Sequence, residues 1–233
     1  MAVEFALLIL AAYLLGSVPA AYLVAKFSRG VDLRQYGSGN VGASNLLMLT
    51  SKRLAIPVFA FDFGKGLAMV WVAQLVGLDL TQQVVVGLLA IVGHNWSVFL
   101  RFSGGRGVLT IMGVGLALPV INGIDPWAMV VFATIAIPGA ILRNTPLRVF
   151  IGLAVLPLAS LGFGESFPLT IGYLIMFVLL IVRRLAVPRA TIAASLSRKE
   201  LLLNRLLFDR DIRDREAWMN RLPLQQEKQG EEA

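Results

Sequence analysis

Long apolar stretches separated by short polar segments dominate this chain. The apolar stretches cover about residues 3–27, 54–77, 82–100, 108–122, 126–142, 149–163 and 168–182. A helix needs about 20 apolar residues to cross a bilayer, and the stretches 108–122 and 149–163 are shorter than that. The pattern predicts an all-α integral membrane protein with about seven transmembrane helices.

The composition agrees with this pattern and narrows the chemistry. Of the 233 residues, 57% are hydrophobic and 15% are charged, whereas a soluble domain has about 25% charged residues. The first apolar stretch has no basic leader and no clear cleavage site, so we interpret it as a retained span. The chain has no cysteine and one histidine. We therefore expect no disulfide, no cysteine nucleophile, no thiolate metal site and no multi-histidine metal site.

Charge alternates between the polar segments. Lysine and arginine gather in segments 28–53, 101–107, 143–148 and the tail from Arg183. The other connections hold only acids, Asp79, Asp125 and Glu165, and Glu4 lies near the amino terminus. The positive-inside rule then predicts an external N-terminus and a cytoplasmic C-terminus. The net charge of +7 is thus a topology signal, and we expect no nucleic-acid partner because no basic stripe with interleaved aromatics occurs.

Two units follow from this organisation. Residues 1–185 form the predicted seven-helix membrane domain, whose motif loops lie in the cytoplasm. Residues 186–233 form a cytoplasmic tail. Segment 195–222 mixes leucines with charges of both signs, which predicts an amphipathic helix docked on the protein or lying at the membrane surface. The polar segment 224–233 is predicted to be disordered.

A first glycine-rich segment, residues 36–45, follows the first apolar stretch. Three glycines free its backbone, and four side chains supply hydroxyl and amide groups, namely Ser38, Asn40, Ser44 and Asn45. Small residues also serve helix packing in membranes, but there they usually recur every fourth position in apolar sequence. The crowding of polar groups favours a polar ligand site over packing.

A second glycine-rich segment joins the third and fourth apolar stretches. Its residues Ser103-Gly-Gly-Arg-Gly107 precede a predicted helix that starts near Val108 and carries Thr110 in its first turn. A helix N-terminus and an arginine both suit phosphate oxygens. We predict phosphate binding here, and the alternative is a tight glycine turn with one topological arginine.

Three ionisable residues lie within the apolar stretches. Asp62 and Lys65 are three residues apart, a spacing that predicts a structural ion pair in a helix. His94, the single histidine, is expected to be a hydrogen-bonded structural residue. It precedes Arg106 by some ten residues, about 15 Å along a helix, so we expect it to lie away from the second glycine-rich segment.

These motifs occur in an ordered set. They are Gly16-Ser-Val-Pro19, Gly37-Ser-Gly-Asn-Val-Gly-Ala-Ser-Asn45, Asp62-Phe-Gly-Lys-Gly66 and Gly93-His-Asn-Trp-Ser-Val-Phe-Leu-Arg-Phe-Ser-Gly-Gly-Arg-Gly-Val-Leu-Thr110. The set resembles the bacterial acyl-phosphate:glycerol-3-phosphate acyltransferase family (the PlsY type). That resemblance is strong over about residues 10–115 and weak beyond. It implies seven membrane helices and transfer of a fatty acyl group from acyl phosphate to the 1-hydroxyl of glycerol 3-phosphate.

The resemblance also implies roles for single residues. Ser38 and Arg106 would be catalytic. Substrate or phosphate would be bound by Asn40, Asn45, Gly104, Gly105, Gly107 and Thr110. Asp62, Lys65 and His94 would orient the site. No metal or cofactor is implied. The substrates would be acyl phosphate and glycerol 3-phosphate, a soluble acyl-phosphate-producing enzyme is a candidate partner, and the active site would face the cytoplasm from the bacterial inner membrane.

The chain departs from the family pattern at several positions. Met48 stands where the family has an arginine, and the family's loop lysine is Arg106 here. The serine expected after the fifth span is not evident. The last family motif survives as Arg205-Leu-Leu207 and Asp211, with Lys199 and Leu202 in place of its histidine and asparagine.

These departures leave open how the lost cation is replaced and what the chain does. The candidate replacements for the missing arginine are Arg34, Lys52, Arg53, Arg143 and Arg148. Two alternatives to the acyltransferase remain. One is a non-catalytic relative that binds anionic lipid or acyl phosphate, and the other is a small-anion transporter.

Overall fold

The computed structural model describes residues 2–142, 144–187 and 190–220, which form helices and connections without a strand. The long helices are α1 (Ala2–Ser17), α4 (Lys52–Leu75), α5 (Leu80–Asn95), α6 (Val108–Ile121), α7 (Trp127–Ala136), α9 (Thr145–Gly162) and α10 (Phe167–Leu185). Shorter α-helices are α2 (Ala20–Arg29), α3 (Ala43–Leu49), α8 (Pro138–Ile141), α11 (Arg198–Phe208) and α12 (Arg215–Met219). The described residues also form three 3₁₀ turns, η1 (Leu33–Gln35), η2 (Val98–Leu100) and η3 (Thr191–Ala193).

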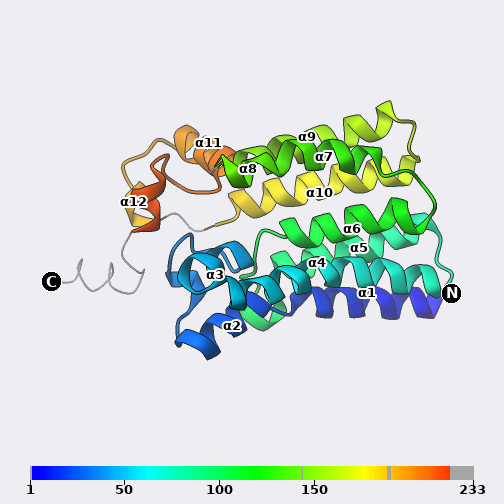
Figure 1. Ribbon diagram of the computed structural model, residues 1–233, viewed down its shortest axis with the longest axis horizontal. Coiled ribbons are helices and arrows are strands. Elements are labelled where there is room, and N and C mark those ends of the chain that lie inside the picture. Colours follow the sequence, from blue (N-terminus) through cyan, green and yellow to red (C-terminus); the bar gives the residue numbers. More distant parts are fainter. Residues whose placement is uncertain (1, 143, 188–189, 221–233) are drawn as a thin grey trace.

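The long helices run along one common axis, as expected for a membrane bundle (Figure 1). Within the described residues, five stretches are long and apolar enough to cross a bilayer: Ala2–Arg29, Lys52–Leu75, Leu80–Leu100, Thr145–Gly162 and Phe167–Leu185. Two apolar helices are shorter, Val108–Ile121 and Trp127–Ala140. The expected all-α membrane architecture is confirmed.

The boundaries of one predicted stretch need correction. Stretch 149–163 was expected to be short, yet α9 begins at Thr145 and has 18 residues. Pro146 lies in its first turn, where a proline suits a helix because no backbone N–H is needed there. Polar residues before the apolar stretch are therefore helical too.

The long helices form two groups that lie side by side. One group contains α1, α4, α5 and α6, and the other contains α7, α9 and α10 (Figure 1). Glycines let backbones in the first group touch. A Cβ atom on Gly93 would collide with the Tyr13 carbonyl of α1, and one on Gly113 would collide with the Phe63 carbonyl of α4. Close approach through small residues is the usual way in which membrane helices associate.

Between the two groups lies the main hydrophobic core. Phe132, Leu153, Leu156 and Tyr173 are fully buried in it, together with side chains from α5 and α6. This core holds α10 against the first helix group. The end of α10 is thereby fixed beside the glycine-rich segment that follows α5.

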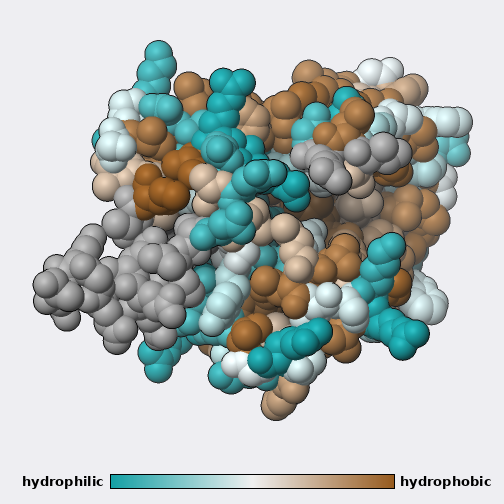
Figure 2. Space-filling view, turned by 60° about the vertical axis from the view of Figure 1, so that its left-hand side comes forward, coloured by the Kyte–Doolittle hydropathy of each residue, from teal (hydrophilic) through white to brown (hydrophobic). Residues whose placement is uncertain are grey.

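The shorter helices α2, α3, α11 and α12 lie at the end of the bundle away from the N-terminus (Figure 1). Figure 2 brings this end forward and shows hydrophilic side chains among hydrophobic ones. Helix α11 packs against α9 and α10 and buries Leu201. The predicted docked helix in segment 195–222 is confirmed for α11, whereas segment 224–233 lies outside the described residues.

Candidate functional site

The first glycine-rich segment, residues 36–45, is shaped around one buried amide. Asn45, 1% exposed at the start of α3, donates from Nδ2 to the carbonyls of Leu33, Tyr36 and Asn40. Its Oδ1 accepts the Ser38 backbone N–H at 3.0 Å. Each of these bonds ends on the protein itself. We therefore assign Asn45 to shaping the segment, and not to contacting a substrate.

Glycines allow the chain to turn tightly around that amide. Gly37 and Gly39 both have positive φ, 56° and 73°, which glycine adopts without steric cost. The Asn40 Oδ1 atom is buried and has no hydrogen-bond partner among the described residues. Ser38 lies nearer the surface, and its hydroxyl accepts the Asn40 N–H. Ser38 and Gly39 therefore form the part of this segment that faces the large cavity described below.

The second glycine-rich segment, residues 101–107, folds back onto the end of α5. The N–H of Gly104 donates to the Asn95 carbonyl at 3.2 Å, and the N–H of Gly105 donates to the His94 carbonyl at 3.0 Å. Arg101 and Phe102 adopt positive φ to make the reversal. The N–H groups of Gly104 and Gly105 are thus used internally and do not wrap an anion.

We expected His94 to lie away from this segment, and that expectation is wrong because the segment folds back onto the end of α5. A Cβ on Gly105 would collide with His94 Nε2, so the imidazole lies directly against the segment. The 15 Å expectation assumed that the chain continues along the axis of α5. The two positive-φ residues after η2 turn it back instead.

Helix α6 begins immediately after this reversal. Gly107 caps it with φ 71°, and the first helical bond runs from the Ile111 N–H to the Gly107 carbonyl at 2.7 Å. The preceding N–H groups of the first turn have no intrahelical acceptor, which makes a helix start favourable for an anion. Arg106 directly precedes this helix start. Thr110 points elsewhere, because its hydroxyl donates to the Asp62 carbonyl at 3.0 Å and is buried.

Two arginines at the end of α10 approach the second segment from the other helix group. Arg183 donates from Nε to the Gly105 carbonyl at 2.9 Å and from a terminal nitrogen to the Gly104 carbonyl at 2.7 Å. Arg184 donates to the carbonyls of Leu206 and Pro146. Both side chains are buried. The sequence pattern gave them only a topological meaning, although two consecutive arginines at a span end were visible.

A cavity of about 190 Å³ opens between these elements. Ser38, Arg106 and both α10 arginines line it, so residues from the two glycine-rich segments meet there. We call it the arginine cavity, because its lining includes Arg34, Arg106, Arg183, Arg184, Arg205 and Arg210.

The charges around the arginine cavity do not balance. Arg106 pairs with Asp209 at 2.5 Å, Arg205 with Asp211 at 2.6 Å, and Arg34 with Asp32 at 2.5 Å. Of the arginines that line the cavity, Arg183, Arg184 and Arg210 have no ion pair within the described part of the chain. A buried cation without a counter-ion is costly, so this cavity is suited to an anion.

Two pKa shifts in groups outside the membrane-spanning helices also indicate an excess of positive charge at the arginine cavity. Burial by itself raises the pKa of the Asp32 carboxyl, but hydrogen bonds from the Arg34 guanidinium and backbone lower it below its ordinary value. Burial lowers the pKa of Arg210 most, and repulsion from the neighbouring Arg215 lowers it further. An anion in the cavity would relieve that repulsion.

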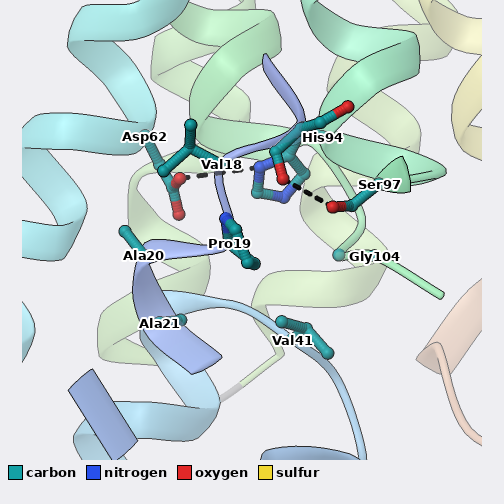
Figure 3. A pocket seen from close by; sticks show the side chains of 11 residues that line it. Val18, Pro19, Ala20, Ala21, Val41, Asp62, His94, Ser97 and Gly104 are labelled. Atoms are coloured by element: carbon teal, nitrogen blue, oxygen red, sulfur yellow. Dashed lines mark hydrogen bonds and ion pairs between the residues drawn. The ribbon is translucent and has the colours of Figure 1, made fainter. Parts of the chain in front are cut away.

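A separate group of charges lies within the spans, and we call it the buried triad: Asp62, Lys65 and His94. Figure 3 shows two of its members, Asp62 and His94, facing each other. Lys65 Nζ lies 2.8 Å from Asp62 Oδ1 and 2.9 Å from His94 Nδ1. The predicted Asp62–Lys65 ion pair is confirmed. His94 Nδ1 also lies 3.6 Å from Asp62 Oδ1, and the Nε2 side of the ring faces Gly105.

A second cavity adjoins the buried triad, lined by Asp62, His94, Ser97 and Gly104 (Figure 3). It measures about 10 Å³, space for one water molecule and not for a substrate. Ser97 donates to the Ser17 carbonyl at 2.5 Å and ties α1 to the end of α5. The buried triad therefore lies directly behind the second glycine-rich segment, in a place with no room for a substrate.

The structure shows where Met48 and the candidate replacements for the missing arginine lie. Met48 is 48% exposed on α3 and does not line the arginine cavity. Of its candidate replacements, Arg34 lines that cavity, Lys52 and Arg53 are exposed at the start of α4, and Arg148 donates to Asn144. Arg143 lies outside the described residues.

The remnant of the last motif is a local structural unit. Arg205 Nε and a terminal nitrogen bond both carboxylate oxygens of Asp211, at 2.6 and 3.2 Å. Asp211 also accepts the Ala190 N–H at 2.8 Å. These bonds hold the turn after α11 against the chain that leaves α10.

Comparison with known proteins places this arrangement in a family. The sequence model of the family described as glycerol-3-phosphate acyltransferase matches residues 6–192. Glycerol-3-phosphate acyltransferase 4 of Dehalococcoides mccartyi (strain CBDB1) is 43% identical over 223 residues, covering 93% of this chain and 94% of that relative. The glycerol-3-phosphate acyltransferase of Pseudomonas fluorescens is 43% identical over 146 residues, covering 61% and 77% of the two chains.

Solved structures show the same fold. The crystal structure of PlsY (YgiH), an integral membrane glycerol 3-phosphate acyltransferase, in its glycerol 3-phosphate form matches with a TM-score of 0.71 and 30% identity. The match covers 91% of this chain and 96% of that one. Its lysophosphatidic acid form matches with a TM-score of 0.67 and 27% identity. The resemblance inferred from the motifs is confirmed, and the chain belongs to the glycerol-3-phosphate acyltransferase family.

Proposed function

We propose that this protein transfers a fatty acyl group from acyl phosphate to the 1-hydroxyl of glycerol 3-phosphate, in the arginine cavity. The products are lysophosphatidic acid and inorganic phosphate. Membership of the family supports the reaction class, and the similar PlsY structures are described in a glycerol 3-phosphate and a lysophosphatidic acid form. The acyl-phosphate donor is the finer part of the proposal and rests on the motif resemblance.

The excess of cations in the arginine cavity carries the proposal. The reaction brings together two phosphate groups, each with about two negative charges at neutral pH. Arg183 and Arg184 are buried and have no carboxylate partner among the described residues, and Arg106 lines the same cavity. Preorganised positive groups in a partly dehydrated site stabilise such charges far more than water does.

The chemistry needs positioning more than a protein base. The glycerol hydroxyl oxygen attacks the acyl carbon, the bond from that carbon to the phosphate oxygen breaks, and phosphate leaves. The hydroxyl proton passes to a phosphate oxygen of the substrates, so no cofactor is required. Arg106 and the start of α6 hold the leaving phosphate, and Ser38 contacts the substrate from the opposite wall. Holding both reactants in contact supplies much of the rate enhancement.

The placement in the membrane follows from the charge pattern. The protein is a multi-pass membrane protein of a bacterial family. We place the N-terminus outside and the arginine cavity on the cytoplasmic face of the inner membrane, since the basic segments gather at that end. A soluble enzyme that makes acyl phosphate then meets the cavity from the cytoplasm.

A second candidate function is a non-catalytic relative that binds anionic lipid or acyl phosphate. The observation that favours it is the position of Met48, which is exposed on α3 and brings no cation to the cavity. Lys199, which aligns with the missing histidine, lies in the exposed first turn of α11. Nothing in the described part of the chain favours a transporter in the same way.

Phosphate release tests the two functions. Lipid-reconstituted protein is given palmitoyl phosphate with and without glycerol 3-phosphate, next to Arg106→Ala and a control, Arg53→Ala, whose arginine is exposed at the start of α4. We expect release that depends on glycerol 3-phosphate, falls at least about a hundredfold in Arg106→Ala and persists in Arg53→Ala. A folded protein that binds palmitoyl phosphate without releasing phosphate would identify the non-catalytic relative.

A further inference from the structure

The arginine assigned to phosphate is already occupied by a carboxylate of the same chain. Arg106 Nε donates to Asp209 Oδ1 at 2.5 Å, and the two residues are 103 positions apart. Their side chains are only 12% and 18% exposed, and both line the arginine cavity. A carboxylate on a guanidinium is the same kind of contact that a phosphate oxygen makes.

The backbone at Asp209 is arranged to direct this side chain. Asp209 ends α11 in the left-handed conformation, with φ 55° and ψ 38°. Few residues other than glycine adopt this region, although aspartate and asparagine tolerate it. Two residues later, Asp211 is fastened by Arg205 and by the Ala190 N–H. The anchored Asp211 therefore holds the turn while Asp209 reaches into the cavity.

The chain after this turn continues over the other glycine-rich segment. Trp218 of α12 lines the arginine cavity and is 7% exposed. A Cβ on Gly37 would lie 3.2 Å from the Met219 methyl carbon, so α12 packs against the first segment. Residues 209–219, which we call the strap, thus contact both segments that the substrates must reach.

The other ion pairs at the cavity are of a different kind. Arg34 pairs with Asp32 and Arg205 with Asp211, each within its own stretch of chain. Among the cavity pairs in the described residues, Arg106–Asp209 alone connects the membrane helices with the strap. Breaking it releases the cation of the phosphate site without disturbing either local pair.

We propose that Asp209 is an autoinhibitory carboxylate, which occupies the phosphate position on Arg106 in the free protein and is displaced by an incoming phosphate group. Asp211 stays anchored, while the part of the strap beyond it, which carries Trp218, moves away and opens the cavity. The inference rests on the proposed function in that it takes Arg106 as a phosphate ligand. The displacing ligand is a dianionic phosphate, whether it belongs to a substrate or to free orthophosphate.

The proposal has a measurable consequence for affinity. If only a fraction of the protein has Arg106 free, the apparent dissociation constant for phosphate is the intrinsic constant divided by that fraction. Removing the carboxylate raises the fraction toward one. We therefore expect the loss of the Asp209 charge to tighten phosphate binding by about three- to tenfold.

Inorganic phosphate is the probe, titrated calorimetrically into the full chain in lipid nanodiscs. The variants are Asp209→Asn and Asp209→Gly, since asparagine and glycine both tolerate the left-handed backbone. The control is Asp214→Asn in the strap, because Asp214 caps α12 without lining the cavity and asparagine caps equally well. In wild type, tryptophan fluorescence with and without phosphate, compared with Trp218→Phe, reports movement of the strap.

Tighter phosphate binding in both Asp209 variants, unchanged binding in Asp214→Asn, and a phosphate-dependent Trp218 signal in wild type support the proposal. Unchanged or weaker phosphate binding in both Asp209 variants overturns it. So does a fall in kcat of about a hundredfold at unchanged phosphate affinity, because Asp209 would then be acting as a base. The titration needs no turnover, so a protein that binds phosphate but transfers no acyl group contradicts the proposed function alone.

Discussion

The buried triad and the arginine cavity share Gly104 as a wall, yet they treat charge in opposite ways. In the triad, one carboxylate faces one ammonium at 2.8 Å, and the space beside them holds about one water molecule. In the arginine cavity, buried guanidiniums outnumber carboxylates around about 190 Å³ of space.

The contrast separates structural charge from functional charge. A complete buried ion pair is costly to break, because removing one partner leaves the other charge uncompensated, but it offers nothing to a ligand. Buried cations without partners are costly in the empty protein, and an anion removes that cost. We expect changes in the triad to act on stability and changes in the arginine cavity to act on binding and turnover.

The largest effect should come from breaking the triad. Asp62→Asn leaves Lys65 buried beside an uncharged amide, and removing one partner of a buried pair costs about 3–5 kcal/mol. Asp79→Asn is the control, because Asp79 caps α5 at the opposite end and asparagine caps as well. Thermal unfolding in detergent measures both. Equal melting temperatures for the two variants would contradict the expectation that the charges of the buried triad act on stability.

Arg183→Met should show the reverse pattern, with a large loss of activity and a smaller loss of stability. Arg183 holds the carbonyls of Gly104 and Gly105, so its loss frees the segment that carries Arg106 and removes a cation from the cavity. We expect acyl transfer to fall about a hundredfold, similar to the loss of one preorganised donor in other enzymes. Arg53→Met is the matched control on an exposed arginine. Turnover near wild type in Arg183→Met would show that the Gly104 and Gly105 carbonyls need no support.

The comparison also shows what sequence could predict. Apolar stretches predicted the helices because lipid forces the backbone to satisfy its hydrogen bonds within each span. The spacing of Asp62 and Lys65 predicted their pairing because i and i+3 meet on one helix face. Glycine and arginine at 104–107 indicated a phosphate-binding segment. The proposed function keeps Arg106 and the start of α6 in that role, whereas the N–H groups of Gly104 and Gly105 bond to carbonyls at the end of α5.

The remaining features depend on contacts between distant parts of the chain. The reversal of segment 101–107 requires positive φ at Arg101 and Phe102, residues that do not usually adopt it. Arg183 meets Gly105 across 78 positions, and Asp209 meets Arg106 across 103. Only the packing of α10 and α11 against the bundle creates these neighbours, and no local pattern encodes it.

Gly104→Ala probes the wall that the two regions share. A Cβ there would collide with the His94 carbonyl and lie 2.8 Å from the Asn95 carbonyl, and backbone atoms cannot move aside cheaply. We expect a loss of about 1–3 kcal/mol in stability, as for other overpacked sites, together with weaker phosphate binding. Gly64→Ala in α4 meets nothing within 4 Å and should stabilise by up to about 1 kcal/mol. Similar melting temperatures in the two variants would contradict the close packing of segment 101–107 on α5.

The smallest effect concerns pH at the edge of the arginine cavity. The Asp32 carboxyl has a pKa below its ordinary 3.8 because Arg34 more than offsets its burial, so its ion pair adds stability above that value. That contribution is lost as pH falls through the lowered pKa. Asp32→Asn keeps one side-chain oxygen to accept the Arg34 backbone N–H, and it removes the charge together with the second oxygen that accepts from the guanidinium. For this partly exposed pair we expect a loss of at most about 1 kcal/mol at pH 7, shrinking toward zero below about pH 3.8. Melting temperatures of both proteins across pH 3–7 measure it, and a difference that grows toward acid would show that the Asp32 charge opposes folding.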